Sequence, residues 1–195
     1  RIYSNEDIPR DDKRLLKSFG DYMDALPSDV ARRDFVKKFG YSLLKLKFLY
    51  DKYIIKREFA KGKDQWSLKR VRIYTDGNTI KSYSYLGTFS KSDNESENEI
   101  SLNREILMLL SMFHVSTPTL VYKHWLNGAL KWCYDQQGEI SGEAYKTYLE
   151  RMAKSFLRDR FLSTTPMDYY EIIYKNGCET QYAGDFSEEA MNKGT

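Results

Sequence analysis

The residues of this chain best suited to chemistry are the lysines and arginines between positions 32 and 74. This block carries 14 basic and 4 acidic side chains, whereas the net charge of the whole 195-residue chain is only +3. Such a block attracts phosphate groups, because binding releases the counterions condensed on a nucleic-acid backbone. The alternative is the solvated face of a long helix, which is the more common role of a charge run.

The candidate nucleic-acid contacts within this block are Lys52, Lys56, Arg57, Arg70 and Arg72. Lys52 and Lys56 are four residues apart and share a helical face, with Arg57 at its border. Alternation places Arg70 and Arg72 together on one face of a strand. Aromatic residues between these cations could stack against bases, although core packing explains those of the helical part equally well. In the competing interpretation, the cations pair with the acidic segments at residues 90–99 and 164–195.

No catalytic pattern accompanies these cations. The chain has no phosphate-binding glycine loop and no G-x-S-x-G elbow. His114 and His124 have neither H-E-x-x-H spacing nor cysteine partners, so structural roles are the simpler interpretation. Cys133 and Cys178 form neither a disulfide framework nor a zinc site, and Cys133 beside Trp132 fits a small core residue. We therefore predict no catalytic residue, no metal, no cofactor and no small-molecule ligand.

The composition is that of a folded domain. Hydrophobic residues make up 41% of the chain and aromatic residues 15%, which excludes a disordered protein. No apolar run approaches the roughly 18–20 residues that cross a bilayer, and the polar, acidic N-terminus is not a signal peptide. These features, with only two cysteines, predict a cytoplasmic protein without a membrane partner. Because the chain starts at Arg1 and stops without a helical end, we expect a piece of a longer protein.

The elements that position the basic block follow from hydrophobic spacing. Apolar residues three and four apart predict helices over residues 11–26 and 29–60, the second capped by Ser28-Asp29 and kinked or split at Gly40. Residues 66–74 and 79–89 predict strands joined by a tight turn at Asp76-Gly77.

Three further helices follow the hairpin and a loop over residues 90–99. They are predicted around residues 102–113, from Thr117-Pro118 to about residue 132, and from Ser141 to about residue 161. Their apolar faces place Phe113, Trp125 and Phe156 in the core. After Gly177 the acidic chain is expected to be tethered rather than packed.

The predicted fold class is mainly α, a bundle of about five helices with one inserted β-hairpin. The helical domain covers residues 1–163, with the hairpin near residues 66–89. Residues 164–195 form a tail that leads to a further C-terminal part of the parent protein.

Three stretches carry a family resemblance: SLLKLKFLYDKYIIKR at residues 42–57, WSLK at 66–69 and MLLSMFHVSTP at 108–118. They resemble the helical region of bacterial GmrSD-like proteins, which follows an N-terminal ParB-like NTPase-type domain. That family includes modification-dependent restriction systems active against foreign DNA. The resemblance spans most of residues 11–163 and implies a helical portion that holds or couples active domains.

The resemblance transfers no catalytic residue. In the family, a D-G-Q-Q-R motif of the N-terminal domain is linked to nucleotide hydrolysis, and many members carry an HNH-type nuclease domain C-terminally. This chain has neither, since Asp135-Gln136-Gln137-Gly138 differs in order and context. The fragment is therefore expected to be inactive, within a parent that the resemblance suggests is an NTP-dependent DNA endonuclease.

The expected function is a non-catalytic helical scaffold or coupling domain of a GmrSD-like restriction or phage-defence protein, with an auxiliary DNA-contact surface. Its expected partners are DNA in the full-length protein and other domains of the same chain. Two alternatives stay open. One is an independent nucleic-acid-binding module, and the other is a protein–protein interaction domain anchored by exposed aromatic residues. Rising salt should weaken nucleic-acid binding strongly, and it should change a protein interface of this kind little.

Overall fold

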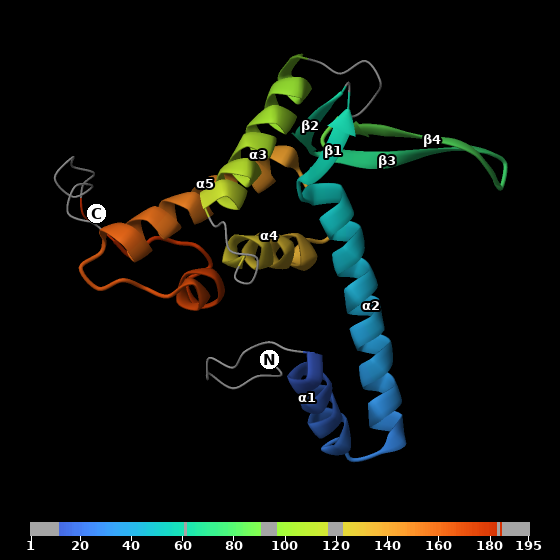
Figure 1. Cartoon of the computed structure of the whole chain (residues 1–195), viewed down its shortest axis with the longest axis vertical. Helices are drawn as coiled ribbons and strands as arrows, with labels where there is room; N and C mark the ends of the chain where they lie inside the picture. Colours follow the sequence, from blue (N-terminus) through green and yellow to red (C-terminus); the bar gives the residue numbers. More distant parts are fainter. Residues whose placement is uncertain (1–11, 61, 91–96, 117–122, 183, 185–195) are drawn as a thin grey trace. The chain divides into compact units, whose positions relative to one another are not determined.

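The computed structural model describes residues 12–60, 62–90, 97–116, 123–182 and 184. The chain divides into two compact units, Arg1–Lys45 and Leu46–Thr195. It is mainly helical with antiparallel β-hairpins, which confirms the predicted fold class (Figure 1). The predicted helix start at Thr117-Pro118 and most of the predicted loop at residues 90–99 lie outside the described residues.

The elements follow one another in this order: α1 (Asp12–Asp24), α2 (Asp29–Tyr53), β1 (Lys56–Ala60), β2 (Lys63–Ser67), β3 (Lys69–Asp76), β4 (Thr79–Gly87), α3 (Glu97–Ser116), α4 (His124–Asp135), α5 (Gly142–Ser155), and the π-helical segments η1 (Phe156–Leu162) and η2 (Glu171–Lys175).

In the first unit, α1 packs against the beginning of α2 through aromatic rings. Phe19 meets Phe39 edge to face, with ring centroids 5.1 Å apart. The hydroxyl of Ser28 accepts a 3.2 Å hydrogen bond from the Ala31 amide, which confirms the predicted cap of α2. The helix continues through Gly40, so this glycine does not split it.

Helix α2 ends at Tyr53, seven residues before the predicted end at residue 60. The carbonyl oxygens of its last turn are satisfied by side chains from other elements. Thr88 donates to the Lys52 carbonyl at 2.7 Å and Tyr145 to the Tyr53 carbonyl at 3.2 Å, while the Lys56 ammonium donates to the Asp51 carbonyl. Because a helix leaves its last carbonyls without partners, these three donors stabilise an end at this point.

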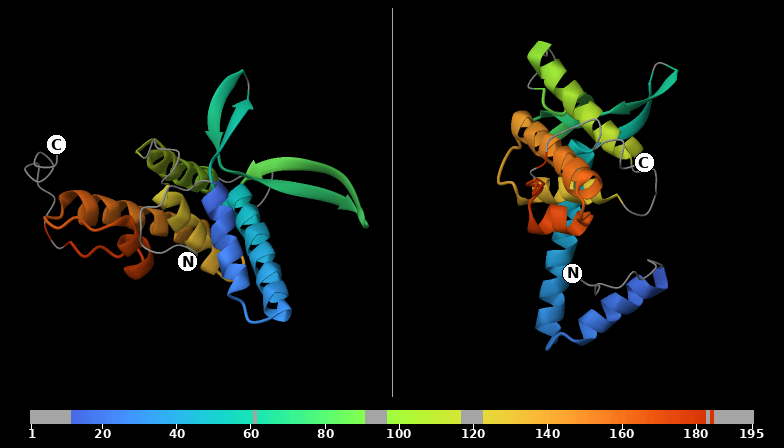
Figure 2. Two further views of the ribbon diagram at one scale, coloured as in Figure 1. Left: turned by 60° about the horizontal axis from the view of Figure 1, so that its bottom comes forward. Right: turned by 90° about the vertical axis from the view of Figure 1, so that its left-hand side faces the viewer.

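The segment after α2 forms a hairpin. The sequence analysis assigned the first part of this segment, up to residue 60, to the helix. Strands β1 and β2 pair antiparallel, with Lys56 opposite Ser67 and Arg57 opposite Trp66. The prediction that Lys52 and Lys56 share a helical face is therefore wrong, and Arg57 lies on β1 as well. The ribbons of the two hairpins diverge from the end of α2 (Figure 2).

The predicted hairpin is present as β3 and β4. Its turn is Gly77-Asn78, one residue later than the predicted Asp76-Gly77, because Asp76 still pairs with Thr79; Gly77 has a φ of 57°, which glycine adopts without strain. Trp66, expected in the first strand of this hairpin, belongs instead to β2. Figure 1 shows β3 and β4 as a long ribbon that projects from the helices of the second unit.

The core of the second unit lies among α3, α4, α5 and the chain that follows. Phe113, Trp125 and Phe156 are 3%, 1% and 8% exposed, which confirms their predicted burial. The rings of Phe113 and Trp125 stack with centroids 6.0 Å apart. Met108 and Met112 are exposed, so α3 is not buried on all sides.

The chain after residue 163 packs onto this core. Ile172 and Ile173 of η2 are buried, and Cys178 is fully buried, so the expectation that the chain after Gly177 does not pack is wrong at Cys178. The buried carboxylate of Asp159 holds the next residues by accepting hydrogen bonds from Thr180, Gln181 and Tyr182. Polar contacts hold these three residues in place, and hydrophobic spacing in the sequence does not predict such contacts.

Candidate nucleic-acid interface

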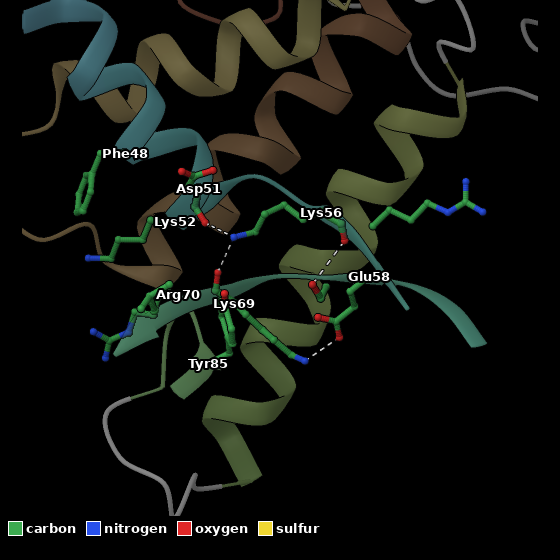
Figure 3. Close-up of a pocket in the computed structure, with 11 residues that line it drawn as sticks. Phe48, Asp51, Lys52, Lys56, Glu58, Lys69, Arg70 and Tyr85 are labelled. Atoms are coloured by element: carbon green, nitrogen blue, oxygen red, sulfur yellow. Dashed lines mark hydrogen bonds and ion pairs between the residues drawn. The ribbon is translucent and has the colours of Figure 1, made fainter. Parts of the chain in front are cut away.

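A surface pocket of about 750 Å³ lies where the end of α2, strand β1 and the ends of β3 and β4 meet (Figure 3). Cations predominate among its charged side chains. The lining residues are Phe48, Asp51, Lys52, Lys56, Arg57, Glu58, Ser67, Lys69, Arg70, Val71 and Tyr85. The pocket therefore brings together four of the five predicted contacts, namely Lys52, Lys56, Arg57 and Arg70.

Lys52 reaches the pocket from the last turn of α2. Its ammonium lies 6.0 Å from the ring centroid of Phe48 and 5.1 Å from that of Tyr53. No carboxylate among the described residues forms an ion pair with it. A cation near a helix C-terminus is favoured by the helix dipole, so its position does not require an acidic partner.

Arg70 reaches the same side of the pocket from β3, as Figure 3 shows. Its Nη2 donates a 2.8 Å hydrogen bond to the carbonyl oxygen of Ser90. Its Nε is buried and has no hydrogen-bond partner in the described part of the chain. A carbonyl does not neutralise the guanidinium, so Arg70 keeps its charge at the pocket.

Lys56 has a structural position in the pocket wall. Besides the Asp51 carbonyl, its ammonium donates to the carbonyl of Lys69 at 3.1 Å and so joins the end of α2 to β3. Burial lowers the pKa of Lys56, with the charge of Asp51 acting in the opposite direction. The structural role of Lys56 is therefore to connect the end of α2 with β3 in the wall of the pocket.

The other cations of the pocket are paired within the basic block. Arg57 forms an ion pair with Asp64 across the first hairpin, and Lys69 forms one with Glu58 at 2.7 Å. The pKa of Glu58 is lowered, mainly by the hydrogen bond that it accepts from Lys69. Arg57 and Lys69 thus pair with acids of neighbouring strands.

The pocket acids do not neutralise Lys52 or Arg70. Asp51 pairs with Lys47 at 2.6 Å, and Glu58 is occupied by Lys69. Phe48 and Tyr85, 63% and 58% exposed, place two aromatic rings beside the two remaining cations. The sequence analysis did not select these rings, although the alternation of tyrosines in residues 79–89 was a signal for Tyr85.

Arg72, the fifth predicted contact, does not line this pocket. It lies on the same face of β3 as Arg70, and its guanidinium is 5.1 Å from the ring centroid of Tyr74. Its role as a DNA contact stays a prediction.

The other candidate groups lie in packed surroundings. His114 lies 4.6 Å from the ring of Trp66, and His124 stacks on Tyr169 at 4.7 Å. Cys133 is buried, as predicted. Among the described residues, no three histidine, cysteine or carboxylate side chains gather in a way that could hold a metal ion. Nor does any helix in the described ranges have the length and apolar character required to cross a membrane.

The arrangement of this pocket suits an anionic ligand that carries flat groups. Lys52 and Arg70, which form no ion pair within the part of the chain that the structure describes, line it together with two exposed rings, on a frame held by hydrogen bonds to backbone carbonyls. No family model matches the chain, and neither a curated protein nor a solved structure gives a match to it.

Proposed function

We propose that this chain is a non-catalytic helical domain of a GmrSD-like restriction or phage-defence protein, and that its basic pocket contacts the phosphate backbone of DNA. The observation that carries the DNA contact is the convergence of Lys52 and Arg70 on one pocket, from α2 and β3, with no carboxylate partner for either among the described residues. The family assignment rests on the resemblance of residues 42–57, 66–69 and 108–118.

The electrostatics of the pocket support a phosphate ligand. Each cation that contacts a phosphate releases counterions, so binding becomes weaker as salt rises. A cation that already pairs with an acid of the protein contributes less to phosphate binding. Arg57 and Lys69 are paired in this way, so Lys52 and Arg70 are the stronger candidates. The guanidinium of Arg70 offers several donors in a fixed plane, a geometry that suits phosphate oxygens.

The scaffold role is supported by the junction at the end of α2. Side chains from β1, from α5 and from the chain after β4 donate to its last carbonyl oxygens. A junction with three such donors resists local opening, because the last turn of an uncapped helix frays easily. It can therefore hold the pocket cations at fixed positions.

The test is a titration of fluorescently labelled duplex DNA between about 50 and 200 mM salt. The native chain is compared with a Lys52→Ala/Arg70→Ala variant, and we expect weaker binding and a salt slope reduced by about 0.9 for each lost contact. The matched control is Arg104→Ala/Lys154→Ala, which removes two exposed cations that do not line the pocket. Equal loss in both variants, or no binding by the native chain, would contradict the proposal.

A protein partner is the second candidate, and one surface favours it. Met108, Met112 and Val115 are exposed on α3 at spacings of four and three, which places them on one side of the helix. Exposed apolar stripes of this kind are typical of protein interfaces. Binding of a protein through these residues would change little with salt. Replacement of Met112 by a polar residue would weaken that binding.

A further inference from the structure

One face of the β3–β4 ribbon is apolar and exposed. Val71 pairs with Tyr85 and Ile73 with Tyr83 across the two strands, and all four side chains point to the same face. Their exposed fractions lie between 50% for Val71 and 68% for Tyr83. A two-stranded sheet is marginal in water, so a ligand that covers this face would stabilise it.

The rings of Tyr83 and Tyr85 contact one another edge to face. Tyr83 and Tyr85 are two residues apart on β4, with ring centroids 6.1 Å apart and ring planes at 87°. The rings therefore meet edge to face, so the edge of one ring lies against one face of the other, and each ring keeps at least one face that its neighbour does not contact. Each can offer a π-face to a flat group of a ligand.

The charges around this face favour an anionic ligand over a protein interface. The cations that favour it lie at the pocket end of the face, because alternation leaves Arg70 and Arg72 on the opposite face of β3 and Lys69 pairs with Glu58. The face also continues into the basic pocket, because Val71 and Tyr85 belong to both. A nucleic-acid strand with phosphates at Lys52 and Arg70 would bring its bases to Tyr85 first, because Tyr85 lines the same pocket.

We infer that the β3–β4 face binds unpaired bases of a nucleic acid, which stack on Tyr85 and Tyr83 while Lys52 and Arg70 hold the neighbouring phosphates. This inference rests on the proposed function and assigns its ligand class: single-stranded nucleic acid, or a strand with exposed bases. In an intact duplex the flat faces of the bases are stacked on one another, so the tyrosines have no ring to contact.

The experiment measures binding of a labelled 15-nucleotide thymidine oligomer and of a matched duplex at low salt. Variants with Tyr83→Leu and Tyr85→Leu keep apolar bulk and lose the aromatic face, whereas Tyr83→Phe and Tyr85→Phe keep it. We expect each leucine substitution to weaken single-strand binding at least about fivefold, with phenylalanine close to native. Tyr41→Leu, at a tyrosine of similar exposure outside the ribbon, is the control and should bind as the native chain does.

The outcomes separate this inference from the proposed function. If the leucine variants bind the single strand as tightly as the native chain, while Lys52→Ala/Arg70→Ala weakens DNA binding, the stacking inference fails and the phosphate contact stands. If the native chain binds neither oligomer, both fail. A leucine variant that abolishes self-association in analytical ultracentrifugation and leaves single-strand binding unchanged would identify the face as a contact between copies, and would also overturn the inference.

Discussion

The hydroxyl of Thr88 donates a 2.7 Å hydrogen bond to the carbonyl oxygen of Lys52, although the two residues are 36 positions apart. Thr88 is buried and lies just after β4, whereas Lys52 is in the last turn of α2. This single bond ties the end of the helix to the end of the ribbon. It also fixes the backbone that carries Lys52, one of the two cations proposed to contact DNA.

Replacement of Thr88 by valine should therefore destabilise the chain. Valine keeps the shape but leaves the Lys52 carbonyl without its donor, at a cost of about 1–3 kcal/mol in the free energy of unfolding. Urea denaturation followed by circular dichroism measures the change. Thr88→Ser retains the hydroxyl and should lose less; an equal loss in both variants would assign the effect to packing.

Phe113 should be among the most sensitive positions of the core. It contacts Trp125 at 6.0 Å and Phe156 at 5.9 Å between ring centroids. Phe113→Ala should lower the free energy of unfolding by about 3–5 kcal/mol, because a cavity replaces a buried ring. The exposed neighbour Met112 is the control, where alanine should change stability by less than about 0.5 kcal/mol. A loss below about 1 kcal/mol at Phe113 would place the centre of the core elsewhere.

Asp159 should hold the C-terminal segment in place. One carboxylate oxygen accepts hydrogen bonds from the amides of Gln181 and Tyr182 at 2.9 and 2.8 Å and from the hydroxyl of Thr180 at 2.9 Å. Asp159→Ala should accelerate hydrogen exchange at these two amides, as measured by mass spectrometry. Asp159→Asn keeps an acceptor oxygen and should preserve most of the protection. Unchanged exchange in the alanine variant would exclude this anchor.

The stability of the chain should fall as the pH drops through the range in which histidine titrates. Burial, assisted by the charge of Lys123, lowers the pKa of His114 below its ordinary value of 6.5. The unfolded state therefore binds a proton before the folded state does, so the stabilising contribution is present above pH 6.5 and is lost below it. Denaturation of native protein and His114→Gln at pH 7.5 and 5.5 checks this. Between pH 7.5 and 5.5 the native chain should lose more stability than the variant. A smaller loss would contradict a lowered pKa of His114 in the folded state.

Both cysteines should be unreactive while the chain is folded. Burial raises the pKa of the Cys133 thiol to about 12 and also raises the pKa of Cys178. Since the thiolate is the nucleophile, a disulfide reagent at pH 8 should react with neither until denaturant is added. Rapid modification of one thiol in native buffer would show that its segment opens on the time scale of the assay.

The local patterns of the sequence determined the helical class, a tight turn at Gly77 and the burial of Phe113, Trp125 and Phe156. These features depend on residue spacing and on backbone preferences within a few residues, so a linear pattern contains them. The basic block itself was also evident, because a concentration of charge needs no fold to be counted.

Only the tertiary structure decided where α2 ends and which cations have no acidic partner among the residues that it describes. The segment after Tyr53 suits both a helix and a strand, and the donors that stabilise the helix end, Thr88 and Tyr145, come from distant parts of the chain. The pairing of Arg57 with Asp64 and of Lys69 with Glu58 depends on the registers of β1 with β2 and on the approach of β3. Net charge is a property of composition, whereas the charge left free to bind a ligand depends on distances that folding sets.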